Sequence, residues 1–277
     1  MGRVETRMYK RRRQRTKALR VTALVVLLAV AALLAWGRLP TAFITEHISA
    51  PSPTPVTSAY DQTVESREVT LAEEIWYAIQ TGVFSTEEAA RQKADAYTKR
   101  GAPGTVVREG EKWRVFIACY GTEADASAVR TRLEQNQKVD TYLYAWKCPQ
   151  LRLRLTGKAG QLDAVEAGFT LLMSTAAALR DMATALDAAQ LTTQEAQATL
   201  SALDGQISLW EDTVRSRFGK SIPELVESML TITASWDTRY QTLQSGEGAT
   251  VLSAALKAEA MGMYDDVIAW RNALAAQ

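Results

Sequence analysis

The sequence predicts an α+β protein in which a βαββαβ sheet domain precedes an antiparallel helical bundle. Two segments, Trp76–Ala90 and Trp113–Ala126, each read as an alternating apolar strand that ends in an aromatic residue, followed by Thr, Glu and an Ala-rich helix. Their threonines, Thr86 and Thr122, lie 36 residues apart, about the length of one βαβ unit. From Gly160 onward, apolar residues recur every three or four positions, which predicts amphipathic helices.

The N-terminal segment is basic and is followed by an apolar one. Residues 1–20 hold nine Lys or Arg and one Glu, a local charge of +8 in a chain whose total charge is +1. The remaining 257 residues therefore sum to −7, which argues against nucleic acid as a partner of the folded part. We interpret residues 1–20 as a basic cytoplasmic tail.

The apolar segment is long enough to cross a membrane. Val21–Trp36 has no charged residue, and with its flanks the predicted anchor covers residues 18–38. The basic flank places the N-terminus in the cytoplasm, so we expect a single-pass cell-membrane protein with extracytoplasmic domains. A cleaved signal peptide is the alternative, with small residues at Ala29, Ala31 and Ala35 as cleavage candidates.

A linker is expected at residues 39–71, because P-S-P-T-P at Pro51–Pro55 lies among Ser, Thr and Ala and buries too little surface to fold alone. The sheet domain then covers 72–157 and the bundle 158–277. The expected strands are Ile75–Val83, Thr105–Arg108, Lys112–Cys119 and Val139–Trp146, and the expected helices are Thr86–Arg100 and Glu123–Gln137.

The sheet order 4-1-3-2 expected for this topology separates Cys119 from Cys148 by the first strand. Two strand spacings of about 4.8 Å exceed the usual Cα–Cα span of a disulfide, so we expect no bond unless Cys148 has left the sheet. The alternating segment Leu151–Leu155 is a candidate for an additional edge strand of the same sheet.

Four helices are expected in the bundle. Capping boxes at Thr192/Glu195 and Ser221/Glu224 begin the second and third helices, and Gly246–Gly248 separates the third from the fourth. The apolar seam of the first helix is Leu162, Val165, Phe169, Leu172, Ala176, Leu179, Ala183 and Leu186. We read the aromatic residues on the other seams as core, since no His, Cys or Glu/His pair accompanies them to hold a metal.

The sheet segment resembles the SPOR domain family. The residues that carry the resemblance are Ile79–Ser85, Ala89–Ala90, Arg114–Ile117 and Gly121, within Trp76–Trp146. The resemblance implies a ferredoxin-like βαββαβ fold that binds septal peptidoglycan, in particular glycan strands without stem peptides. The chain departs from the family's Gly-Pro-Phe at Ala118-Cys119-Tyr120, where the aromatic residue is kept and the Gly-Pro turn is lost.

Strand alternation supports a binding face independently of the resemblance. One face of the sheet carries the helices, and the other is expected to be open and aromatic. Aromatic rings can contact the C–H faces of sugars, while amide and guanidinium groups hydrogen-bond to their hydroxyl and N-acetyl groups. The candidate glycan-binding residues are Trp76, Gln80, Arg114, Phe116, Tyr142 and Tyr144, with Trp146 on the same face.

Catalysis and cofactors have no support in the sequence, which lacks a Ser-His or Cys-His pair, a His/Glu metal cluster and a Gly-rich phosphate loop. We expect a non-enzymatic, membrane-anchored protein that binds peptidoglycan glycan strands at division septa or sporulation sites. A protein partner is a further candidate for the bundle. The alternative is a protein-interaction scaffold whose sheet face is covered by the C-terminal helices.

Overall fold

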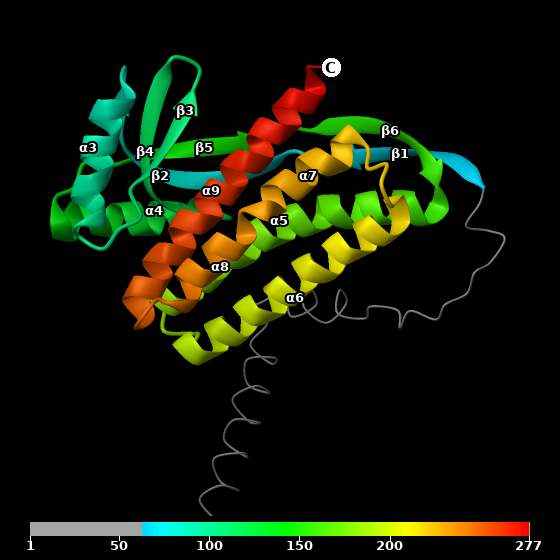
Figure 1. The fold of residues 1–277 in the computed structure, drawn as a ribbon. Helices are drawn as coiled ribbons and strands as arrows, with labels where there is room; N and C mark the ends of the chain where they lie inside the picture. The colour runs from blue at the N-terminus through cyan, green and yellow to red at the C-terminus, as the bar shows by residue number, and fades with distance from the viewer. Residues whose placement is uncertain (1–62, 277) are drawn as a thin grey trace, which may run out of the picture. The chain divides into compact units, whose positions relative to one another are not determined.

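The computed structural model describes residues 63–276, and the predicted basic tail, membrane anchor and most of the linker lie outside this range. The described part combines two antiparallel sheets with a set of long helices (Figure 1). Its elements are β1 (Val64–Leu71), β2 (Glu74–Phe84), α3 (Glu87–Thr98), β3 (Thr105–Glu109), β4 (Lys112–Tyr120), α4 (Glu123–Arg132), the π-helix η2 (Leu133–Gln137), β5 (Tyr142–Cys148), β6 (Leu151–Lys158), α5 (Ala159–Asp187), α6 (Thr193–Phe218), α7 (Glu224–Ala234), α8 (Trp236–Gln244) and α9 (Ala249–Ala275).

The four-stranded sheet has the order β3-β4-β2-β5 with every neighbouring pair antiparallel, which confirms the predicted topology. Helix α3 begins at Glu87, one residue after the predicted Thr86, and α4 begins at the predicted Glu123. Thr86 and Thr122 are their N-caps, and both hydroxyls accept backbone N–H bonds at the helix N-termini. Both cysteines are free and buried, as strand order predicts. Burial raises the pKa of Cys119 to about 12 and that of Cys148 to about 11.

Two expectations about the flanks of this sheet are wrong. Val64–Leu71, placed in the linker, forms β1, and the segment that begins at Leu151 pairs with β1 instead of joining the four-stranded sheet. Val69 and Leu71 of β1 pack on the main core, and Arg67 forms ion pairs with Asp163 and Glu166 of α5. The alternating pattern of β1 lies well after the proline-rich stretch, so composition averaged over the whole linker hides it.

The long helix α5 is central to the bundle, and all eight residues of its predicted apolar seam are buried. By length and composition it is the one helix within residues 63–276 that could cross a membrane, but 56% of its most apolar stretch is buried inside the protein. It therefore packs here as a core helix.

The four-helix prediction is wrong in one respect, because the third helix is interrupted at Ser235 and forms α7 and α8. Its N-cap is Pro223 instead of the predicted Ser221.

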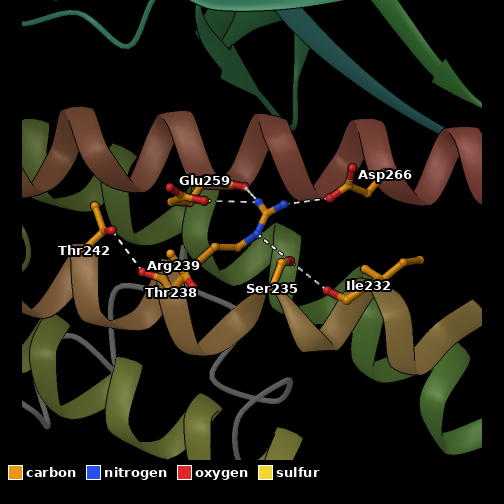
Figure 2. A network of polar contacts seen from close by, with 7 residues as sticks. All are labelled: Ile232, Ser235, Thr238, Arg239, Thr242, Glu259 and Asp266. Atoms are coloured by element: carbon orange, nitrogen blue, oxygen red, sulfur yellow. Dashed lines mark hydrogen bonds and ion pairs between the residues drawn. The ribbon is translucent and has the colours of Figure 1, made fainter.

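Arg239 fastens the short helix α8 to α9 (Figure 2). Its guanidinium donates to the Ser235 hydroxyl at 3.0 Å, to the Glu259 carboxylate at 3.1 Å and to the Asp266 carboxylate at 2.6 Å. A Cβ atom at Gly262 would lie 3.1 Å from this guanidinium, so glycine provides the space for it. The ion pairs are part-buried and multiply hydrogen-bonded, which is the arrangement in which such pairs hold elements together.

Asp265, beside this network, provides a prediction about pH. Burial, and then the neighbouring charge of Asp266, raises the pKa of Asp265 from 3.8 to about 6. A raised carboxyl pKa means that the folded state binds the proton more tightly, so this group lowers stability as pH rises from about 4 to about 6. Asp265→Asn should therefore raise the free energy of unfolding at pH 7.5 by about 2 kcal/mol and give no gain near pH 4.

Urea unfolding at both pH values checks this expectation, with Glu247→Gln in the exposed loop before α9 as the control. The control should change stability little at either pH. An equal effect of Asp265→Asn at pH 4 and pH 7.5 would contradict the assignment.

Candidate functional site

The sheet face opposite α3 and α4 is not open, because α9 covers it. Trp76 is 1% exposed, and the Tyr264 ring of α9 stacks on it with centroids 3.9 Å apart and planes 3° apart. The Tyr264 hydroxyl donates to the carbonyls of Glu74 at 3.1 Å and Trp146 at 3.0 Å. In Figure 1, α9 runs past the sheet alongside α5.

Further contacts hold α5 and α9 against this face of the sheet. The Arg180 guanidinium of α5 lies 4.5 Å from the centre of the Trp76 ring, on which it forms a cation–π contact. Arg271 of α9 donates to the carbonyls of Ala72 and Pro149, at the ends of β1 and β5. Phe116 is fully buried and its ring centre lies 5.1 Å from that of Trp146. The expectation of an open face is therefore wrong for Trp76, Phe116 and Trp146.

One corner of this face does reach solvent, and it brings together the other predicted residues. Tyr142 is 64% exposed, while Tyr144 and Arg114 are half-buried beside it. The Arg114 guanidinium lies over the Tyr144 ring, 4.4 Å from its centre, and donates to the Gln80 side-chain oxygen at 2.7 Å. Gln80 itself is only 7% exposed, so its role is to position Arg114.

Glu109 is a further member of this corner. It lies just after the predicted strand Thr105–Arg108 and was not among the predicted site residues, but it is the last residue of β3. Its carboxylate accepts from Arg114 Nε at 2.6 Å and, with its other oxygen, from the Tyr144 hydroxyl. The β3–β4 hairpin offers a signal for this placement. Glu109 pairs with Lys112, so alternation brings Glu109 and Arg114 to the same face as diagonal neighbours.

At neutral pH the Glu109 carboxylate is charged and the Tyr144 hydroxyl is neutral. Burial acts to raise the pKa of Glu109, but the hydrogen bonds from Tyr144 and Arg114 together lower it. Burial, followed by the hydrogen bond to Glu109, raises the pKa of Tyr144 to about 12. We define the sheet corner as Gln80, Glu109, Arg114, Tyr142 and Tyr144. It presents two tyrosine rings and an oriented guanidinium, a combination suited to a sugar ring with polar substituents.

A protein-family model matches the part of the chain that contains this sheet. Residues 76–145 match the family model of the SPOR domain. This segment is a SPOR domain. The match runs from β2 into β5, so β1, β6 and the helices of the bundle lie outside it. Comparisons with the curated proteins and with the solved structures gave no match.

The SPOR domain implies peptidoglycan binding, and its family is one of binding domains without a catalytic role. In this chain the bundle occupies much of the aromatic face of the SPOR domain. Among residues 63–276, the part of that face that stays accessible to a ligand is the sheet corner.

Proposed function

We propose that this chain is a membrane-anchored protein that binds the glycan strands of bacterial peptidoglycan through the sheet corner of its SPOR domain. The observation that carries the proposal is the Arg114–Tyr144 pair, held in place by Gln80 and Glu109 beside the exposed ring of Tyr142. Gln80 and Glu109 hold the guanidinium in a fixed position, so little side-chain entropy is lost when a ligand binds.

The proposed anchor is Val21–Trp36, with the basic tail in the cytoplasm and the SPOR domain outside. The proposed site of action is the division septum or the sporulation septum, where the family commonly localises. A fluorescent fusion of the full chain, compared with one lacking residues 76–145, tests this part. Septal enrichment only in the presence of the SPOR domain is the expected outcome.

Replacing Tyr142 with alanine tests the site. The side chain is 64% exposed, so the substitution should leave folding intact while removing an aromatic contact with sugar. We expect sedimentation with amidase-stripped peptidoglycan to weaken about tenfold, because one aromatic contact contributes about 1–1.5 kcal/mol. Arg114→Ala should weaken binding further, because Arg114 is the corner's cationic donor.

Leu209→Ala is a matched control, because Leu209 is an exposed apolar side chain on α6, 61% accessible and away from the SPOR domain. It should bind like the unmodified chain. Undiminished sedimentation of a Tyr142→Ala, Arg114→Ala double variant would exclude the sheet corner as the glycan site.

The second candidate function is a protein-interaction scaffold, and the Trp76–Tyr264 stack favours it specifically. On this view the covered sheet face serves to join the SPOR domain to the bundle, and the bundle binds a protein partner. Sedimentation with peptidoglycan distinguishes the two functions. A scaffold would sediment with peptidoglycan no better after amidase treatment than before it, and Tyr142→Ala would leave its behaviour unchanged.

A further inference from the structure

We propose that a second saccharide site lies between α4, η2 and the C-terminal end of α5, away from the sheet corner. A cavity of about 470 Å³ opens there, at the junction of the SPOR domain and the bundle. The inference rests on the proposed function, since it assigns the same ligand class, one sugar unit of a glycan strand, to a further site.

Tyr120 provides the first observation. It lines the cavity, is 5% exposed, and its hydroxyl has no hydrogen-bond partner among residues 63–276. The Tyr120 hydroxyl is not one of the fully buried side-chain atoms that lack a partner, so it reaches the cavity and can hydrogen-bond there with solvent or with a ligand.

The surroundings of Tyr120 supply further polar groups from three elements. Asp125 and Arg132 come from α4, Asn136 from η2, and Thr184 from α5. Asp187 of α5 also lines the cavity, but it is already paired with Lys257 and Ser253. Burial and then the charge of Asp187 raise the pKa of Tyr120, so its hydroxyl stays protonated and can donate a hydrogen bond.

The backbone of η2 is the second observation. Residues Leu133–Gln137 form a π-helix that continues directly from α4 and ends at Lys138, which has a positive φ of 51°. A π-helix is rare, and such turns are frequently found at functional sites. Here it carries Asn136 and Gln137, which line the cavity.

The chemistry of the lining selects the ligand class. Tyrosine and threonine hydroxyls and the two side-chain amides both donate and accept hydrogen bonds, as sugar hydroxyls and N-acetyl groups do. Val129, Leu133 and Ala188 supply apolar wall for the C–H faces of a ring. The volume is within the range of about 300–1,000 Å³ usual for small-ligand pockets, and domain junctions are a common place for them.

The test is titration of the purified full chain with the disaccharide of N-acetylglucosamine and N-acetylmuramic acid. We expect Tyr120→Phe to weaken binding about three- to tenfold, the loss that one uncharged hydrogen bond gives. Because the ring is retained and an unpaired hydroxyl is removed, the thermal midpoint should stay equal or rise. Asn136→Ala, at an exposed position, should weaken binding by a similar factor.

Tyr97→Phe is the matched control, since Tyr97 is buried in the same cluster as Tyr120 but does not line the cavity. It should bind like the unmodified chain. The second site would be overturned if the unmodified chain did not bind the disaccharide, or if the Tyr120→Phe and Asn136→Ala variants bound it as tightly as the unmodified chain.

These experiments test the proposals for the sheet corner and for the second site independently of each other. Strand sedimentation that depends on Tyr142, without disaccharide binding that depends on Tyr120, would overturn the second site alone. Disaccharide binding that depends on Tyr120, with strand sedimentation indifferent to Tyr142, would overturn the sheet corner and support the second site.

Discussion

Replacing Tyr264 with alanine should destabilise the folded chain by about 3–5 kcal/mol, the range for removing a large buried aromatic side chain. The ring is fully buried between α9 and the sheet, stacked on Trp76 and edge-on to Trp146 at 5.0 Å. Its loss leaves a cavity and two backbone carbonyls without their donor. Equilibrium urea unfolding, followed by tryptophan fluorescence, should show a lower midpoint.

Two matched variants separate the contributions to this effect. Tyr264→Phe keeps the ring and removes only the hydroxyl, so we expect a loss of about 1–2 kcal/mol. Tyr240→Ala removes a half-buried ring of α8 that stacks on Trp236 with ring centres 6.2 Å apart, and it should cost less than Tyr264→Ala. A Tyr264→Ala variant as stable as the unmodified chain would show that α9 does not cover the sheet in solution.

The same packing decides which substitutions can test glycan binding. Trp76 and Phe116 belong to one buried cluster with the bundle, so alanine at either position should unfold or loosen the protein before it reports on a ligand. A loss of binding in such variants would follow from either function. Tyr142 is free of this problem, because its side chain is mostly in solvent.

Strand alternation predicts which side chains share a sheet face, but not what covers that face. Trp76, Phe116, Tyr144 and Trp146 do lie on one side, as a period of two requires. The Tyr264 ring that covers Trp76 and Trp146 comes from α9, a helix more than 100 residues later whose apolar residues fit equally well inside a bundle. Periodicity describes each element alone, and the pairing of two apolar surfaces is a property of the whole chain.

The wrong predictions about the ends of single helices have causes in the neighbouring residues. Ser221 with Glu224 has the spacing of a capping box, but Pro223 between them has its φ fixed by its ring and takes the N-cap position instead. The spacing of apolar residues continues unchanged from α7 into α8, so it does not predict the break at Ser235. The residues of the second site are polar and scattered over three elements, and only the fold brings them together.

The second large effect is expected at Gly168, in the middle of α5. Replacing glycine with alanine inside a helix normally stabilises it by about 1 kcal/mol. At Gly168 a Cβ atom would lie 2.3 Å from Met229 Cε and 2.6 Å from Trp210 Cζ2. The methionine end can move, but the Trp210 indole is held by its hydrogen bond to the Ala164 carbonyl at 2.8 Å.

Gly168→Ala should therefore destabilise the chain by about 1–3 kcal/mol, the usual effect of overpacking a core. Gly205→Ala is the control on the neighbouring helix α6, where no atom lies within 4 Å of the added Cβ and the position is exposed. That variant should gain about 0.5–1 kcal/mol. Opposite signs for the two glycines in urea unfolding are the expected result, because the same methyl group meets a fixed indole in one helix and solvent in the other. A gain in both would mean that α5 and α6 are not packed through Trp210.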